Sequence, residues 1–571
     1  MMKSTILTLG LLLSFSVAVA QGGSAGSPED ATRRREARIA WWREARFGMF
    51  IHWGPVSLTG LEISWSRANS NPKCPNKGPT PVDVYDHLYQ EFNPVRFDAR
   101  QWVATARAAG MKYMVLTAKH CDGFLLWHSQ ADSYNIASTP FRRDVCGELT
   151  QAAHDEGMRL GWYFSPMDWR DPDFRTERNA AFLGRMQNEV KELLGNYGRI
   201  DLLWFDWDGR EPPYDQLNTY ALVRKMQPDI VIDNRLDLGI GNDNTEIRSP
   251  NADYYTPEQR IGRYDDQRPW ETCMTLGTQW SWKPNDTIKS TKEVIHILAR
   301  VVGGDGNLLL NVGPMPDGRI EPRQAEVLRQ VGAWLEANGE SIYGTRGGPF
   351  KPSSALVSTR KGNDIYVHIL KRSDEKVTLP PLPKKIVKSQ LLTGGTVPVV
   401  QTDSGITLTV PQPDAQSADT IIKLTLDGSA QEIPPLDVTR PGVIKPDMKA
   451  TASNTYRRDP AYSPGKAIDE DDETRWATDG GTKQAWLEVD LGQPMTFESA
   501  EIDEAYAGRV RSFELQYREG QQWKTFYQGT TLGEQFSATF NPVTARHVRL
   551  SVLDASDGPT ITEFQLFRSD K

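Results

Sequence analysis

Two aspartates stand among aromatic residues in the segment RIDLLWFDWDG (199–209). Burying a carboxylate beside aromatic rings costs free energy unless another group compensates it. Asp206 ends an apolar run and Asp208 comes two residues later, so strand alternation points both side chains to the same side. Asp206 lies nearer the strand, whereas Asp208 precedes Gly209 and suits a turn. We therefore favour Asp206 as a reactive carboxylate, and the alternative is a structural aspartate that caps a loop.

A reactive carboxylate often works with a second one. Retaining glycosidases use two carboxyl groups about 5–5.5 Å apart, a nucleophile and an acid/base. The downstream candidates are Glu258 in DYYTPEQ and Glu271 in PWETC, and both have aromatic neighbours that favour a neutral carboxylic acid. Each also has a structural alternative: Glu258 suits the first turn of a helix after Pro257, and Glu271 suits a salt-bridged supporting position. The residues alone leave both glutamates open.

Short apolar runs alternate with helical patterns over the first 300 residues. The runs occupy 47–54, 111–120, 158–166, 200–209, 229–235 and 306–314, and the clearest helical patterns occupy 97–110, 145–157 and 177–198. Buried strands that alternate with helices indicate parallel βα units. We predict an α/β fold, a (β/α)₈-like barrel with some helices missing. An open doubly wound sheet is the alternative, but no glycine-rich phosphate loop follows the first run.

The barrel prediction says where the chemistry lies. Active sites of such barrels form at the carboxyl ends of the strands. Five polar side chains follow or end the predicted strands: His52, His120, Tyr163, Asp206 and Arg235. We expect them to meet at one rim.

After about residue 344 the sequence pattern changes from alternating strands and helices to short strands. We predict the catalytic barrel over 30–344, where a last amphipathic helix ends, and a small antiparallel β-sandwich over 345–430. Four prolines in 431–446 predict a stiff linker. Strand-like pieces return over 447–571 and predict a second all-β domain.

Composition restricts the class of protein. The 571 residues include 66 Lys+Arg and 74 Asp+Glu, and the net charge of -8 argues against a nucleic-acid binder. Residues 1–20 have a basic start, an apolar run and small residues before Gln21, as in a signal peptide. That run is too short to span a bilayer, and no later segment approaches the length of a membrane span. We expect a periplasmic or secreted protein. The sequence does not indicate its oligomeric state.

Six motifs resemble those of one enzyme family. FGMFIHWG, KHCDGF, LLWFDWDG, YYTPEQ, PWETCMTLGTQWSW and GGDGNLLLNVGPMPDG closely resemble the α-L-fucosidases of glycoside hydrolase family 29, over about residues 30–430. The resemblance implies an exo-acting retaining α-L-fucosidase that removes terminal fucose from oligosaccharides or glycoprotein glycans without a metal or cofactor in the active site. It makes Asp206 the nucleophile and Glu258 the acid/base, with Glu271 as the alternative.

The resemblance also implies the sugar-binding residues. His52, His120, Tyr163 and Arg235 hold the hydroxyls, Trp204 and Glu271 line the site, Trp65 belongs to an acidic and aromatic loop, and Trp280 faces the C5 methyl group. Cys121 stands where the family usually has a second histidine, and a thiol is a weak hydrogen-bond partner. This departure motivates an alternative, a relaxed-specificity enzyme that also cleaves α-L-galactosides.

Residues 447–568 resemble the discoidin or coagulation factor 5/8 type C domain. The resemblance implies carbohydrate binding, with Tyr456 or the stretch 506–511 as candidate contacts. It also implies a possible structural calcium ion at the oxygen-rich loop AIDEDDETRW (467–476). A secreted carbohydrate-binding protein without catalysis is the alternative from another class.

Overall fold

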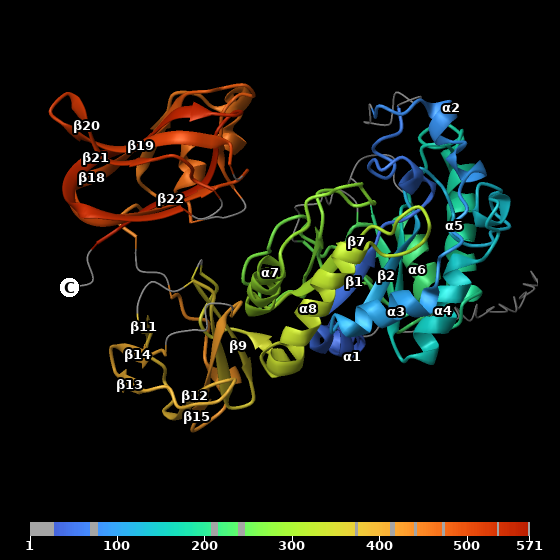
Figure 1. The fold of residues 1–571 in the computed structure, drawn as a ribbon, viewed down its shortest axis with the longest axis horizontal. Coiled ribbons are helices and arrows are strands. Elements are labelled where there is room, and N and C mark those ends of the chain that lie inside the picture. The colour runs from blue at the N-terminus through green and yellow to red at the C-terminus, as the bar shows by residue number, and fades with distance from the viewer. Residues whose placement is uncertain are drawn as a thin grey trace, which may run out of the picture.

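The structure is a computed structural model with a barrel, a β-sandwich and a β jelly roll in chain order (Figure 1). It describes residues 28–68, 78–206, 215–237, 246–353, 355–371, 375–411, 417–438, 442–470, 474–506, 508–533 and 536–568, with side chains from residue 32. The predicted signal peptide, Cys74 and Asp208 lie outside these ranges.

Parallel strands form the barrel wall, in the order β5-β4-β3-β2-β1-β7-β6. Their bounds are β1 (Phe47–Ile51), β2 (Tyr113–Lys119), β3 (Arg159–Phe164), β4 (Leu202–Phe205), β5 (Val231–Ile232), β6 (Glu271–Thr275) and β7 (Asn307–Val312). Bridges from Asp233 to Tyr254 and from Tyr255 to Trp270 connect β5 to β6 through the segment 254–258. This segment joins the sheet edges, so the predicted barrel-like fold is confirmed.

Helices cover the outside of the strands (Figure 1). They are α3 (Ala99–Ala108), α4 (Val145–Asp155), α5 (Asn179–Gly195), α6 (Gln216–Met226), α7 (Thr291–Gly303) and α8 (Pro322–Asn338), whereas the short helix α2 (Val82–Tyr85) lies in the segment between β1 and α3. Local signals start them: Asp98 accepts hydrogen bonds from two backbone amides of α3, and Ser290 and Glu293 form a capping box at α7. Their buried faces hold the helices against the strands.

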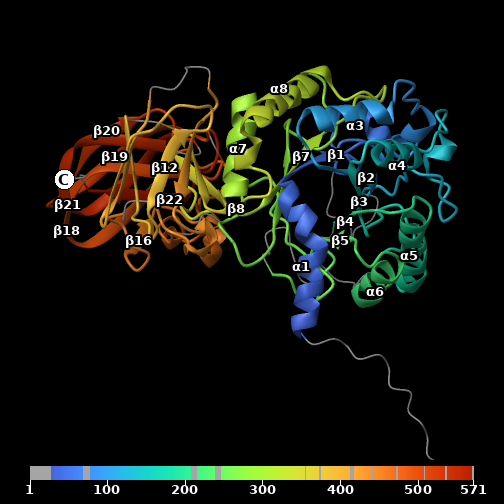
Figure 2. The same cartoon turned by 90° about the horizontal axis from the view of Figure 1, so that it is seen from below.

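Helix α1 (Pro28–Ala45) lies against the barrel and contributes to its interior (Figure 2). Ile39 and Trp42 are buried in one apolar cluster with Phe50, Tyr113 and Trp204 from the strands. Because Tyr113 is the first residue of β2, this helix packs at the amino-terminal end of the barrel. The carboxyl-terminal end of the barrel, where the candidate site is expected, is therefore not covered by α1.

The β-sandwich packs against the barrel through α7. One sheet has the order β12-β15-β10-β9-β8 and the other β11-β14-β13. The bounds are β8 (Arg346–Gly347), β9 (Leu356–Lys361), β10 (Asp364–Ile369), β11 (Lys376–Leu379), β12 (Ile386–Leu391), β13 (Val399–Thr402), β14 (Gly405–Thr409) and β15 (Thr420–Leu426). A Cβ atom at Gly303 would lie 3.0 Å from Val357 Cβ, so the glycine permits this close contact of α7 with β9.

The last domain is an antiparallel sheet of order β17-β22-β18-β21-β19-β20, with β16 paired to β18. Its strands are β16 (Lys449–Ala452), β17 (Trp476–Ala477), β18 (Ala485–Glu504), β19 (Val510–Glu519), β20 (Gln522–Gly529), β21 (Phe536–Ala555) and β22 (Thr560–Phe567). The described ends of the predicted linker pack on their neighbours: Leu436 bridges to Phe350, and Ile444 is fully buried beside Gln565.

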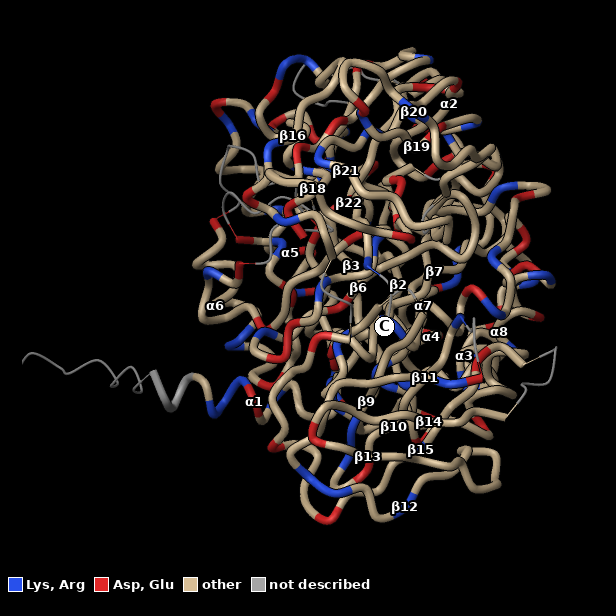
Figure 3. Tube along the Cα trace, turned by 90° about the vertical axis from the view of Figure 1, so that its left-hand side faces the viewer, with Lys and Arg blue, Asp and Glu red and all other residues tan. Residues whose placement is uncertain are grey.

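Two observations bear on the expectation that the protein neither spans a membrane nor binds nucleic acid. Among the described residues, no helix is both long and apolar enough to cross a membrane. Basic and acidic residues are interspersed along the traced chain (Figure 3).

Candidate active site

The polar residues predicted at the strand ends gather at the carboxyl-terminal rim of the barrel. The parallel register sets Tyr163 of β3 beside Trp204 of β4, and Asp206 follows Trp204 by two residues. His52 and His120 directly follow β1 and β2, and their ring centroids lie 5.8 Å apart. The rim therefore brings together residues that are far apart in the chain.

Two hydrogen bonds hold the Asp206 carboxylate. The Tyr163 hydroxyl donates to Oδ2 at 2.6 Å, and Arg235 Nη1 donates to Oδ1 at 2.9 Å. Asp206 retains 23% exposure of its side chain, although the two donors are almost fully buried. The two hydrogen bonds fix the Asp206 carboxylate in a position that is still accessible from solvent.

Glu258 lies across the same guanidinium. Its backbone bridges to Cys273 of β6, which sets the residue beside the barrel wall. Glu258 Oε2 lies 2.9 Å from Arg235 Nη1, and the side chain is 25% exposed. Because the same nitrogen also contacts Asp206, the two nearest carboxylate oxygens are no more than about 6 Å apart.

Arg235 is itself held in place. Its Nε donates to Thr256 Oγ1 at 2.6 Å and its Nη2 to Thr256 O at 3.2 Å. The guanidinium carbon lies 4.5 Å from the ring centroid of Trp204. Burial lowers the pKa of Arg235, but the charges of Glu258 and Asp206 outweigh burial and raise it above the ordinary value. Arg235 therefore stays charged between two acidic groups.

Asn311 joins His52 to Trp280. Asn311 Nδ2 donates to the Trp280 carbonyl at 2.7 Å, so its Oδ1 is the acceptor that faces His52 Nδ1 at 2.7 Å. The network assigns the proton of His52 to Nδ1 and leaves Nε2 as an acceptor. Burial lowers the pKa of His52 well below its ordinary value, and His120 lowers it further. His52 is thus neutral, and its Nε2 can accept a hydrogen bond.

The loop after β1 supports the second histidine. Ser64 Oγ lies 2.6 Å from His120 Nδ1 and accepts the backbone N–H of Asp122 at 2.9 Å. The His120 ring stacks on Tyr163 at 5.4 Å between centroids. Burial lowers the pKa of His120, so this ring is also neutral.

Several predicted sugar contacts have other partners here. Tyr163 and Arg235 direct their polar groups to Asp206, and Trp204 lies beneath them with about 1% exposure. Glu271 begins β6, is fully buried, and accepts hydrogen bonds from Trp42, Tyr113 and Trp204. Its predicted contact with the sugar is therefore wrong, since its carboxylate lies toward the closed end of the barrel.

Comparison with known proteins agrees with this geometry. A family model described as Alpha-L-fucosidase matches residues 15–340, more than half of the chain. Human plasma alpha-L-fucosidase is 31% identical over 330 residues, which cover 54% of this chain and 69% of the human protein. The chain belongs to the alpha-L-fucosidase family. A second model, the F5/8 type C domain, matches residues 449–564.

Solved structures of the family share the fold. Alpha-L-fucosidase isoenzyme 1 from Paenibacillus thiaminolyticus is 34% identical with a TM-score of 0.62, covering 69% of this chain and all of that one. A family 29 alpha-L-fucosidase from Bacteroides thetaiotaomicron, solved as a trapped covalent intermediate with 2-fluoro-fucosyl fluoride, is 27% identical with a TM-score of 0.61. It covers 69% of this chain and 96% of its own.

Trp65 and Cys121, two residues in the family-like motifs, lie in different surroundings. Trp65 is exposed and packs edge-on against Trp169 with 5.2 Å between ring centroids, so it stands at the edge of the site. Cys121 is 1% exposed, and its Sγ lies 3.2 Å from Ser165 Oγ. The thiol is packed beside the site, and its place among the sugar contacts stays a prediction. Among the described cysteines, Cys121, Cys146 and Cys273 are buried.

The structure adds supporting residues that the motifs did not single out. Thr256 fixes Arg235, and Asn311 fixes His52 and Trp280. Glu62 accepts the backbone N–H of Trp280 at 2.8 Å, and burial raises the pKa of Glu62. A single amide inside the apolar run LLLNV was the available signal for Asn311, since a buried polar side chain needs a partner.

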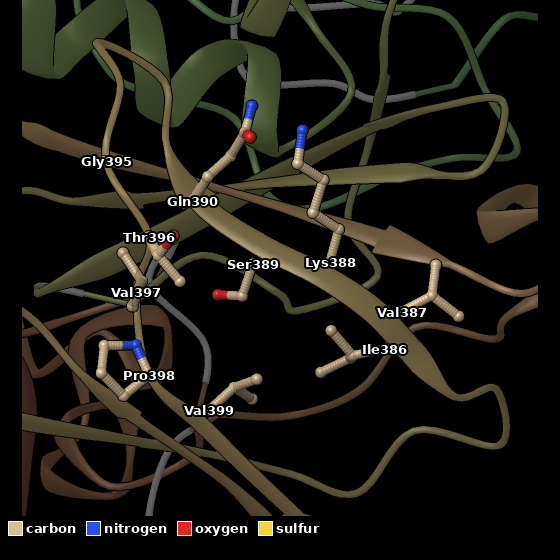
Figure 4. A pocket seen from close by; sticks show the side chains of 10 residues that line it. All are labelled: Ile386, Val387, Lys388, Ser389, Gln390, Gly395, Thr396, Val397, Pro398 and Val399. Carbon is tan, nitrogen blue, oxygen red and sulfur yellow. The ribbon is translucent and has the colours of Figure 1, made fainter.

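Two hollows lie outside the barrel. One of about 430 Å³ lies beside β12 in the sandwich (Figure 4), and none of its lining residues is acidic or a histidine. The other, of about 660 Å³, lies in the F5/8 type C domain between the loops 452–463 and Asp479. Its lining includes Asn454, Arg458 and Asp459, side chains of the kind that bind sugar hydroxyls.

Proposed function

We propose that this protein is an exo-acting retaining α-L-fucosidase that hydrolyses terminal α-L-fucose from oligosaccharides or glycoprotein glycans. One observation carries the proposal: Asp206 and Glu258 contact the same nitrogen of Arg235. Their nearest oxygens, no more than about 6 Å apart, suit the spacing of about 5–5.5 Å in retaining enzymes better than the 6.5–9.5 Å of inverting ones. The trapped covalent intermediate of the Bacteroides thetaiotaomicron relative supports the same mechanism.

The first step uses the two carboxyl groups in different protonation states. Asp206, oriented by the Tyr163 hydroxyl and by Arg235, acts as the carboxylate, and Glu258 acts as the carboxylic acid. Asp206 attacks the anomeric carbon, the bond to the leaving oxygen breaks, and protonated Glu258 donates its proton to that oxygen. The product is a fucosyl ester of Asp206 and an ionised Glu258.

The second step reverses the roles. The ester of Asp206 carries no charge, so Arg235 then faces the Glu258 carboxylate as its remaining anionic partner of the pair. Glu258 takes a proton from water, the hydroxyl attacks the anomeric carbon, and Asp206 leaves as a carboxylate. Two inversions give net retention, and no cofactor enters either step of the proposal.

Recognition of fucose depends on the neutral imidazole of His52, which accepts a hydrogen bond, and on an aromatic wall formed by Trp280. His52 Nε2 accepts a hydroxyl of the sugar, and the half-buried indole of Trp280, 4.7 Å from His52, meets the C5 methyl group. An apolar wall favours a methyl group, while a hydroxymethyl group needs room and a polar partner. The thiol of Cys121 points to Ser165, so it does not support the relaxed α-L-galactosidase alternative.

Turnover and product stereochemistry test the proposal together. We expect hydrolysis of para-nitrophenyl α-L-fucoside at a higher kcat/KM than the matching α-L-galactoside. Proton NMR during the reaction should show α-L-fucose first, before mutarotation. A β-anomer as the first product contradicts the retaining mechanism, and the absence of turnover favours a carbohydrate-binding protein without catalysis.

We propose that the F5/8 type C domain binds carbohydrate and one structural calcium ion. The Lys466 carbonyl, the Asp469 carboxylate and the Thr474 hydroxyl converge, with Thr474 Oγ1 2.8 Å from Asp469 Oδ1 and 3.2 Å from Lys466 O. Oxygen ligands suit calcium, although residues 471–473 of this loop lie outside the described part. Excess EDTA should lower the Tm of this domain and calcium should restore it, and an unchanged Tm contradicts the ion.

We also propose export to the periplasm or medium. Residues 1–20 carry the pattern of a signal peptide, and Gln21 follows the small residues. The amino-terminal sequence of the protein secreted by its host should begin at Gln21. An intact Met1 contradicts the proposal.

A further inference from the structure

The Glu271 carboxylate collects hydrogen bonds from three parts of the barrel. Its Oε2 accepts the indole N–H of Trp42 on α1 at 3.1 Å and the hydroxyl of Tyr113 on β2. Its Oε1 accepts the indole N–H of Trp204 on β4 at 3.3 Å. The Glu271 carboxylate therefore joins α1, at the amino-terminal end of the barrel, to β2 and β4.

Trp204 connects this buried carboxylate to the rim. Its ring stacks on Tyr163 with 5.5 Å between centroids and an angle of 20°, and the Arg235 guanidinium lies 4.5 Å from the same ring. Tyr163 and Arg235 are the two donors that hold Asp206. One indole thus supports both of them.

The indole needs an acceptor to keep this position. Trp204 has a donor and no acceptor in its side chain, and it is about 1% exposed, so its N–H cannot turn to water. A buried donor without a partner costs about 1–3 kcal/mol, which favours any rotation that finds one. Glutamine at position 271 keeps one acceptor oxygen but directs an NH₂ group at neighbouring donors.

We propose that Glu271 is a positioning residue for the nucleophile, because it fixes Trp204 and thereby the Tyr163 and Arg235 contacts with Asp206. The inference rests on the proposed function for its kinetic consequence. It replaces the sugar contact that the motif predicted.

A double-mutant cycle tests the coupling. Glu271→Gln replaces one of the two acceptor oxygens with an NH₂ group that faces the neighbouring donors, and Trp204→Phe removes the N–H while keeping an aromatic ring. We expect each substitution to lower kcat on para-nitrophenyl α-L-fucoside by about 10-fold or more, with KM changed by less than about 2-fold. The double variant should lose no more than about the larger single loss, because both substitutions break one link. Losses that multiply in the double variant overturn the proposal.

Tyr113→Phe is the matched control. It removes another donor to the same carboxylate but leaves the hydrogen bond from Trp204. We expect a lower Tm with kcat within about 2-fold of the wild type. A kcat loss as large as that of Glu271→Gln indicates a general loss of packing and contradicts the specific route through Trp204.

Crystal structures give an answer that does not depend on turnover. In Glu271→Gln, or in Trp204→Phe if the first variant does not fold, the Tyr163 hydroxyl should move beyond hydrogen-bond distance of Asp206. An unchanged contact in the folded variant overturns the positioning role. Absent fucosidase activity in the wild type contradicts the proposed function alone, because this structural comparison still tests the support of Asp206.

Discussion

Asp206 follows β4, Glu258 ends the segment 254–258 between β5 and β6, and both contact one nitrogen of Arg235, at 2.9 Å from each. Three ionisable groups therefore act as one unit. The guanidinium compensates one negative charge fully, so a proton on one of the two acids leaves the group neutral. Asp206 also accepts a hydrogen bond from the Tyr163 hydroxyl at 2.6 Å.

The effect of replacing Glu258, the proposed acid/base, on the hydrolysis rate should depend on the leaving group of the substrate. Glu258→Gln cannot donate the proton, so hydrolysis of natural fucosides, whose leaving oxygen is basic, should fall by about 10²–10⁴-fold. Fucosyl fluoride, which needs less protonation, should form the ester at a rate close to that of the wild type, and added azide should then yield α-L-fucosyl azide. Steady-state and pre-steady-state rates on both substrates measure this, and equal losses on both contradict the role of Glu258.

Truncation of the aromatic wall should change specificity. Trp280→Ala leaves the peptide group in place, because Glu62 and Asn311 hold its N–H and carbonyl. The kcat/KM ratio of α-L-fucoside to α-L-galactoside should fall by about 10-fold or more as space opens for the hydroxymethyl group. The two aryl glycosides, assayed side by side, give the ratio. If both rates fall equally, Trp280 does not meet the C5 substituent.

The buried Glu271 should make stability depend on pH. Burial raises the pKa of Glu271 to about 7 against the opposing effect of hydrogen bonds from Tyr113, Trp42 and Trp204. Between the ordinary value of 4.5 and about 7, the folded protein holds a proton that the unfolded chain releases, so stability falls as pH rises. Relative to Glu271→Gln, the wild type should lose about 3 kcal/mol over this range and then level off.

Calorimetric unfolding of both proteins from pH 4.5 to 8 measures that difference. The glutamine variant is the matched control because it has no proton to lose at position 271. Parallel profiles, or a wild type that gains stability with rising pH relative to the variant, contradict the expected sign.

The hollow in the F5/8 type C domain should affect large substrates alone. Arg458→Ala removes a lining cation from the hollow without touching the barrel. If the domain raises the local concentration of glycan, activity on a polymeric fucosylated glycan should fall several-fold while hydrolysis of the aryl fucoside stays unchanged. Lys524→Ala, an exposed cation outside the hollow, is the control. Equal effects on both substrates argue against carbohydrate binding there.

The sequence alone predicted the barrel strands through their apolar runs. The runs at 47–54 and 158–166 contain β1 and β3, and the run at 200–209 placed Asp206 at the end of β4. Strand ends are readable because the apolar pattern stops there. In contrast, β6 (Glu271–Thr275) has no continuous apolar run, so the sequence pattern did not predict this strand or the buried position of Glu271.

Contacts across strands required the three-dimensional register. Tyr163 is next to Trp204 because β3 and β4 pair in one parallel alignment, and no local pattern specifies that alignment. The same register directs the Tyr163 hydroxyl to Asp206 rather than to the sugar. Thr256 and Asn311 act through single hydrogen bonds, and such partners follow from packing and not from motif spacing.

Chemical rescue of Asp206→Gly tests the central claim most directly. The account predicts a folded variant that hydrolyses aryl α-L-fucosides at least about 10³-fold more slowly than the wild type, since the attacking group is gone. Azide should then restore release of the aryl group and yield β-L-fucosyl azide, because one displacement inverts the anomeric carbon. Wild-type-like turnover, or rescue that yields the α-azide, would contradict Asp206 as the nucleophile.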